Sequence, residues 1–227
     1  QSQNLALQQV VGAPNAPRLV TRRATTVNGR PPSTPSTLDL SLTLPLIADA
    51  DPALALTLLR RILDNDAMSS GPPLLPTIVW QLYRATGSRE LLVAALPPLR
   101  AELARWYGRD ADHDGIPEWP DASQPNAGPH PHFGPGSAQG LDIRTVEAPD
   151  LLAYLWRSER TLAAIAAELG HAPDPGHAER APRPERASRL QTALAAMWQR
   201  PTRSYHYRDR DGHHLPRTHI ILDLEQA

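Results

Sequence analysis

Cysteine is absent from the 227 residues of this chain, and so are long apolar runs. The lack of cysteine excludes disulfides and thiolate metal sites, but it does not identify a compartment, because exported proteins can also lack cysteine. No apolar run approaches the ~18 residues that a membrane-spanning helix requires. The formal net charge is only −1, so we expect neither nucleic acid nor a membrane surface as a partner.

Proline, by contrast, is abundant, with 25 residues where a usage of ~5% is typical. The excess prolines lie between apolar stretches, so we predict that they mark the loops between helices. The composition favours an N-terminal arm or loop over residues 1–36, a helical-hairpin domain over 37–200 and a β-hairpin tail over 201–227. The first residue is Gln and no signal segment follows it, so we expect the natural start to lie upstream or to have been removed.

Apolar periodicity predicts about six helices, arranged as three helix–turn–helix pairs. The clearest predicted helices cover residues 53–63, 74–86, 88–107, 151–169 and 187–198. Local signals mark several of their ends. Asp51 and Pro52 are residue types that begin a helix, Gly87 is a typical residue after a helix end, and Ser88 is a typical N-cap.

Three stretches are harder to assign. Residues 37–48 alternate like a strand, but their context favours a short helix interrupted at Pro45. The Pro-Pro pair at 97–98 predicts a kink or a break in the helix that contains it. Residues 204–224 alternate again, and the Asp-Gly pair at 211–212 is a candidate turn between two short strands.

Four acidic residues and one glycine between positions 110 and 118 form the most distinctive local pattern of the sequence. Asp110, Asp112 and Asp114 alternate and are followed by Gly115, as at the start of a calcium loop, and Glu118 can contribute a further oxygen. The alternative is a solvated acidic turn. Acids at a helix C-terminus are unfavourable unless a cation or an arginine compensates them. We therefore expect no required cofactor but a possible Ca²⁺ site at residues 110–118.

Other chemistry lacks sequence support. The histidine clusters, His130 with His132 and His213 with His214 and His219, lack the i, i+4 spacing of helical zinc motifs. The chain has no Gly-rich phosphate loop, no G-x-S-x-G elbow and no CxxC pair. These absences argue against a transition-metal site and against nucleotide, serine-hydrolase and redox functions.

Three segments in succession resemble a known group of enzymes: PPLLPTIVWQLYRATGSRELL, LARWYGRDADHDGIPEW and VEAPDLLAYLWRSERTLAAIAAELG. In this order they are similar to the central part of the (α/α)6-toroid glycoside hydrolases. That group includes trehalase, processing α-glucosidase I, mannosylglycerate hydrolase and bacterial debranching-like relatives. The resemblance covers roughly residues 74–211. It implies an all-α fold made of antiparallel helical hairpins of a partial toroid, with a small β tail.

The resemblance also implies hydrolysis of α-linked glucosides or related oligosaccharides by inversion. In the group, a general acid aspartate follows the acidic loop and a general base glutamate lies near the end of the barrel. This chain departs at both points, because residues 123–133 contain no carboxylate and the chain stops before the base. We therefore expect a fragment of a longer enzyme or a reduced relative without activity.

Four residues are the candidates for contact with a sugar. Asp121 is the candidate general acid, with the base supplied by further chain; its alternative is a loop carboxylate held by backbone amides. Trp119 can stack on a sugar ring or pack the loop onto the barrel end. Gln124 and Asn126 can bind sugar hydroxyls.

Two functions of other classes remain open. One is a non-catalytic carbohydrate-binding or scaffold fragment that keeps the shape of the barrel. The other is an α-hairpin module whose concave face binds protein. The partners that we expect are a carbohydrate substrate and the remainder of the barrel or another chain.

Overall fold

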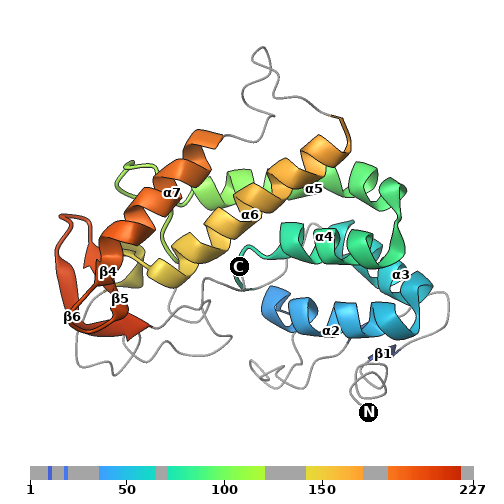
Figure 1. Cartoon of the computed structure of the whole chain (residues 1–227), viewed down its shortest axis with the longest axis horizontal. Helices are drawn as coiled ribbons and strands as arrows, with labels where there is room; N and C mark the ends of the chain where they lie inside the picture. The colour runs from blue at the N-terminus through green and yellow to red at the C-terminus, as the bar shows by residue number, and fades with distance from the viewer. Residues whose placement is uncertain are drawn as a thin grey trace.

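The computed structural model describes residues 10–11, 18–19, 36–64, 71–120, 142–170 and 184–220. Within these ranges the chain forms six α-helices with a small antiparallel sheet at one end (Figure 1). The helices are α2 (Thr37–Ala50), α3 (Pro52–Leu63), α4 (Leu75–Thr86), α5 (Arg89–Tyr107), α6 (Pro149–Glu168) and α7 (Pro184–Met197). The predicted architecture of helices with a small β tail is confirmed.

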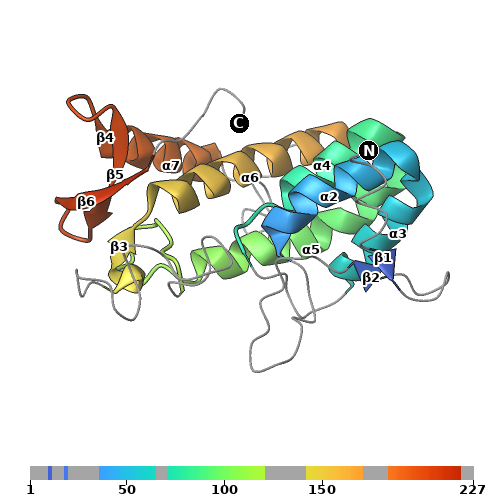
Figure 2. The ribbon, with the colours of Figure 1, turned by 90° about the horizontal axis from the view of Figure 1, so that it is seen from below.

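The helices form two layers. Consecutive helices pack as pairs, α2 with α3, α4 with α5 and α6 with α7. Helices α2, α4 and α6 also pack side by side in one layer, and α3 contacts α5 in the second layer (Figures 1 and 2). The three predicted helix–turn–helix pairs are therefore present.

Local capping determines several helix ends, as the sequence predicted. The Asp51 carboxylate accepts a hydrogen bond from the Leu54 amide at 3.0 Å and caps α3. Gly87 ends α4 in the left-handed conformation with φ +68°. Ser88 then caps α5 through a hydrogen bond from the Leu91 amide.

Proline breaks neither helix, although the sequence predicted an interruption at Pro45 and a kink or a break at 97–98. Helix α2 is continuous through Pro45, and α5 is continuous through the pair at 97–98. An interior proline costs about 3 kcal/mol, because it removes a backbone hydrogen bond and its ring crowds the preceding turn. In α2 the neighbouring Leu40, Leu44 and Ile47 are fully buried. Burial of such side chains offsets a cost of that size, and local sequence signals do not report it.

The sheet is built around strand β5 (Ser204–Asp209), which pairs antiparallel with three other strands. These are β3 (Val146–Glu147), β4 (Trp198–Gln199) and β6 (His214–Ile220). The predicted turn at 211–212 is confirmed: Gly212 has φ +82° and donates to the Asp209 carbonyl at 2.9 Å. The sequence did not predict β3 and β4, which join the tail to the start of α6 and the end of α7.

Two further strands, β1 (Val10–Val11) and β2 (Arg18–Leu19), pair antiparallel within the N-terminal arm. Most of that arm lies outside the described residues.

One core cluster joins the helices to the sheet. It contains apolar side chains of all six helices, together with Trp119 from the loop after α5 and Tyr207 from β5, both fully buried. In the part of the chain that the structure describes, none of the helices has the length and apolar character needed to cross a bilayer.

Candidate functional site

Residues 110–120, which we call the acidic loop, form a tight turn after α5. The Asp112 carboxylate accepts a hydrogen bond from the Asp114 amide at 3.3 Å. The Asp114 carboxylate accepts one from the Ile116 amide at 2.7 Å, and Asp110 accepts one from the Gly115 amide at 2.8 Å. Gly115 has φ +90°, a conformation that favours glycine. The acids therefore converge because their own carboxylates hold the turn.

Three of the four predicted calcium ligands lie together. Carboxylate oxygens of Asp110, Asp112 and Glu118 lie within 4.8 Å of one another. Among the described residues, the buried Oδ1 atom of Asp110 has no hydrogen-bond partner, and the Oε2 atom of Glu118 accepts from the Ala111 amide at 3.0 Å. Burial and the charges of Asp112 and Asp110 raise the pKa of Glu118 to about 7. Oxygen ligands, negative charge and an unpartnered oxygen fit a hard cation.

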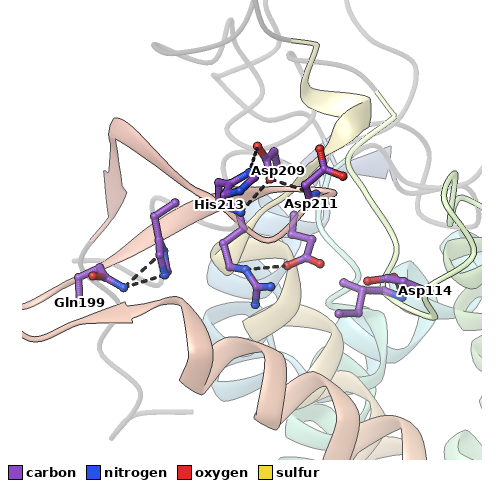
Figure 3. A network of polar contacts seen from close by, with 9 residues as sticks. Asp114, Gln199, Asp209, Asp211 and His213 are labelled. Carbon is purple, nitrogen blue, oxygen red and sulfur yellow. Dashed lines mark hydrogen bonds and ion pairs between the residues drawn. The ribbon is translucent and has the colours of Figure 1, made fainter.

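The fourth predicted ligand, Asp114, turns away from this group. Its carboxyl group hydrogen-bonds to that of Glu147 on β3, and burial raises the pKa values of both, that of Glu147 to about 7. The Nε atom of Arg208 lies 3.8 Å from the Oε2 atom of Glu147. Figure 3 shows Asp114, a residue of the acidic loop, at one edge of this network. The pair links the acidic loop to the sheet, which the sequence did not predict.

A second group of possible ligands lies at the turn between β5 and β6, where Asp209, Asp211 and His213 gather (Figure 3). The Oδ1 atom of Asp209 accepts from the amides of Asp211 and His213, at 3.0 and 2.8 Å. The Oδ2 atom of Asp209 lies 3.2 Å from Nδ1 of His213. These hydrogen bonds lower the pKa of Asp209, foremost the one from the His213 backbone. Stabilisation of the turn accounts for this group.

Trp119 is fully buried at the end of the acidic loop. Its ring packs edge-on against that of Trp106 on α5, with centroids 5.6 Å apart and planes at 85°. Its indole N–H donates to the Oδ1 atom of Asp150, at 3.2 Å. The observed position corresponds to the packing alternative for Trp119, and contact with a sugar stays a prediction.

Asp150 collects hydrogen bonds from three segments. It is the second residue of α6, and besides the Trp119 indole it accepts from the Leu151 amide at 2.9 Å. The hydroxyl group of Tyr207, on β5, donates to it as well. Burial raises the pKa of Asp150, and its hydrogen bonds, foremost the one from the Trp119 indole, oppose that rise. The only sequence signal for Asp150 was an ordinary helix start, so its role was missed.

The other three candidate sugar-contacting residues, Asp121, Gln124 and Asn126, lie outside the described residues. The described chain ends at Pro120, one residue before Asp121, and resumes at Asp142. The structure therefore defines only the parts of the candidate site outside residues 121–141, which are the acidic loop, the start of α6 and the sheet.

No family model and no curated protein sequence matches the chain. Solved structures do match it. A mannosylglycerate hydrolase of the GH63 family from Thermus thermophilus, in complex with Tris, matches with a TM-score of 0.65 and 16% identity over 95% of this chain and 69% of that one. The same enzyme in complex with glucose matches with a TM-score of 0.64 and 18% identity over 94% of this chain and 67% of that one.

An uncharacterised conserved protein from the same organism matches with a TM-score of 0.62 and 18% identity over 91% of this chain. The chain spans 65% of the length of that protein, so it corresponds to about two thirds of the structures that it matches. At these identities the likeness shows the fold. The predicted fold class, helical hairpins of a partial (α/α)6 toroid, is confirmed, and so is the resemblance on which it was based.

Proposed function

We propose that this chain forms part of a glycoside hydrolase that cleaves α-linked glucosides or related oligosaccharides with inversion. The observation that carries the proposal is the likeness of nearly the whole chain to a mannosylglycerate hydrolase, one structure of which is a complex with glucose. The acidic loop adds support, because hydrogen bonds hold its turn and its Trp119, and Asp121 follows it directly in the sequence.

In this proposal Asp121 is the general acid, and Gln124 and Asn126 bind sugar hydroxyls. The general base comes from the remainder of the barrel or from another chain, since inversion needs two carboxyl groups roughly 6.5–9.5 Å apart, on opposite sides of the bond. Asp121 and Glu118 are too close in sequence to flank a bond easily. Trp119 contributes by holding the loop in place.

The test is a survey of sugar release from α-linked disaccharides, made with this chain and with a longer chain that includes the rest of the barrel. We expect the longer chain to hydrolyse at least one α-glucoside and the shorter chain to bind it without turnover. If neither releases sugar and calorimetry detects no binding to either, the carbohydrate function is wrong.

A second candidate function is a non-catalytic carbohydrate-binding or scaffold fragment. It is favoured by the composition of residues 123–133, which contain no carboxylate. This function predicts sugar binding with no hydrolysis, even when the rest of the barrel is present.

We also propose that the acidic loop binds Ca²⁺ through Asp110, Asp112 and Glu118. The cation would offset the repulsion of three converging carboxylates. Since the pKa of Glu118 is raised to about 7, its proton competes with the cation, and binding should tighten between pH ~6 and pH ~8.

Melting of chelated protein with and without Ca²⁺ tests this site. At a cation concentration of ~100 Kd the stabilisation is about 2.7 kcal/mol, which corresponds to roughly 5–10 °C for a chain of this size. Glu118→Gln should abolish the rise, whereas Asp211→Asn, in the group at the β5–β6 turn, should retain it. An unchanged melting temperature in the wild-type protein would count against the site.

A further inference from the structure

An open hollow of about 740 Å³ lies where α7 packs against β5 (Figure 1). Small side chains of α7 line it, among them Ser188, Thr192 and Ala196, which recur every four residues and therefore share one side of the helix. Two guanidinium groups line it as well, that of Arg189 on α7 and that of Arg208 on β5. A hollow of this volume accommodates a molecule of metabolite size.

The acidic loop fixes the guanidinium group of Arg189. Its Nη1 atom donates a hydrogen bond to the Asp114 carbonyl oxygen at 3.3 Å. The group also lies so close to Gly115 that a Cβ atom added to this glycine would be 1.9 Å from Nη1. Because a backbone carbonyl carries no net charge, this hydrogen bond holds the guanidinium group in place without neutralising it.

The guanidinium group of Arg208 is fixed in a similar way by the sheet. A Cβ atom added to Gly212, in the turn after β5, would lie 2.9 Å from its Nη2 atom. Its Nε atom is 3.8 Å from the Oε2 atom of Glu147, which is within the range of an ion pair but too long for a hydrogen bond. Within the described part of the chain, this buried Nε atom has no hydrogen-bond partner. The ion pair therefore positions Arg208 without occupying a donor of its guanidinium group.

The charged groups around the hollow favour an anion. Its lining contains the two guanidinium groups and one carboxylate, that of Glu185, so positive charge is in excess. Guanidinium groups bind the oxygens of phosphates and carboxylates through paired N–H donors. Since other contacts already fix Arg189 and Arg208, ordering these side chains around a ligand would cost little free energy. The hydroxyl group of Ser188 can donate a further hydrogen bond.

We propose that this hollow binds a small molecule that carries a phosphate or a carboxylate group. Arg189 and Arg208 recognise the anionic group, and the small side chains of α7 leave room for the uncharged part of the molecule. The site does not depend on the glycoside hydrolase function, because it uses the residues around the hollow and needs no reaction.

Calorimetric titration of this chain at low salt tests the site with glucose 6-phosphate, glucuronate and glucose. The three probes share a sugar ring and differ in the group attached to it. We expect at least one of the two anions to bind roughly tenfold more tightly than glucose. Tighter binding of glucose 6-phosphate assigns the site to a phosphate, and tighter binding of glucuronate assigns it to a carboxylate. Anions that bind no more tightly than glucose, or that do not bind at millimolar concentrations, would overturn the proposal.

Variants of the two arginines locate the binding. Arg208→Gln and Arg189→Gln should each weaken anion binding by roughly tenfold, because each removes charged donors. Arg208→Lys should weaken it less than Arg208→Gln, since it keeps the charge and loses the planar fork. Arg210→Gln is the matched control: Arg210 is exposed in the β5–β6 turn, so the variant makes the same change in net charge away from the hollow. An equal loss in Arg210→Gln would reduce the effect to general attraction and refute the site.

Glu185→Gln gives a result that damage to the fold cannot imitate. It removes the carboxylate from the lining, so the anion should bind roughly two- to threefold more tightly. Unchanged or weaker binding in this variant would count against the hollow. Amide shifts in NMR spectra upon addition of the anion should gather at Ser188, Thr192 and the β5–β6 turn, and shifts gathered elsewhere would place the ligand at another site.

Discussion

Glu102 on α5 is a buried acid outside the candidate site. It is 2% exposed, and within the described part of the chain its Oε2 atom has no hydrogen-bond partner. Burial raises the pKa of Glu102 to about 8, although the charges of Arg105 and Arg109 oppose that rise. The folded state therefore holds a proton that the unfolded state releases at lower pH. The contribution to stability is complete below pH ~4.5 and is lost as pH rises toward ~8.

Glu102→Gln removes this pH dependence, since glutamine is neutral throughout. The free energy of unfolding of the variant should exceed that of the wild type increasingly between pH ~4.5 and ~8, by up to about 5 kcal/mol above that range. Urea unfolding at several pH values measures the difference. Glu90→Gln, an exposed change on the same helix, is the control and should leave the pH profile unaltered. A difference that does not grow with pH would refute the explanation.

Gly115 is a second residue whose surroundings let us predict the effect of a substitution on stability. It has φ +90°, and a Cβ atom placed there would lie 1.9 Å from the Nη1 atom of Arg189, which donates to the Asp114 carbonyl. Gly115→Ala should cost about 2 kcal/mol, from backbone strain and the displaced guanidinium. Gly170→Ala is the matched control, because Gly170 has φ +76° and a Cβ atom added there would meet no atom of the described residues within 4 Å.

Gly170→Ala should therefore cost only the ~1 kcal/mol of the left-handed conformation. In an Arg189→Ala background the two alanine substitutions should become equally costly. Equal costs in the wild-type background would mean that Arg189 does not press on the acidic loop. Thermal and urea unfolding provide both comparisons.

At the scale of elements, the helix ends follow local signals. Ser88→Ala should destabilise the protein by about 1 kcal/mol, because the Leu91 amide at the start of α5 loses its side-chain acceptor. Ser88→Asn should restore most of that loss, since asparagine is also a good N-cap. Chemical unfolding distinguishes the three proteins, and a Ser88→Ala variant as stable as the wild type would contradict the capping role.

Local signals such as Ser88, Gly87 and Asp51 could be predicted because each acts within one turn of its own helix. The continuity of α2 through Pro45 could not, since it depends on tertiary burial of the opposite face. The extra strands β3 and β4 were missed for a related reason. Each has two residues and exists only because β5 lies beside it.

In the candidate site, too, local contacts could be predicted from the sequence and long-range contacts could not. The tight turn of the acidic loop was predictable, because its hydrogen bonds link residues five or fewer positions apart. The pairing of Asp114 with Glu147, and of Trp119 with Asp150, joins segments about 30 residues apart. Only the packing of α5, α6 and the sheet brings those segments together. The sequence therefore predicted the turn of the acidic loop but not the distant residues that pack against it.

At the scale of the whole molecule, the described residues form three helical hairpins of a partial (α/α)6 toroid with a small sheet at one end. The chain corresponds to about two thirds of the structures that it matches. An open hollow of about 740 Å³ lies beside α7, and its lining includes Ser188, Arg189 and Ala196 of α7 together with Arg208 of β5.

The most direct measurement of the central claim is proton NMR of the products of α-glucoside hydrolysis by the longer chain, with wild-type protein and with Asp121→Asn. The account predicts that the wild-type enzyme releases the β-anomer first, as inversion requires, and that Asp121→Asn lowers the rate at least a hundredfold with KM little changed. Initial release of the α-anomer, or an Asp121→Asn variant as active as the wild type, would contradict it.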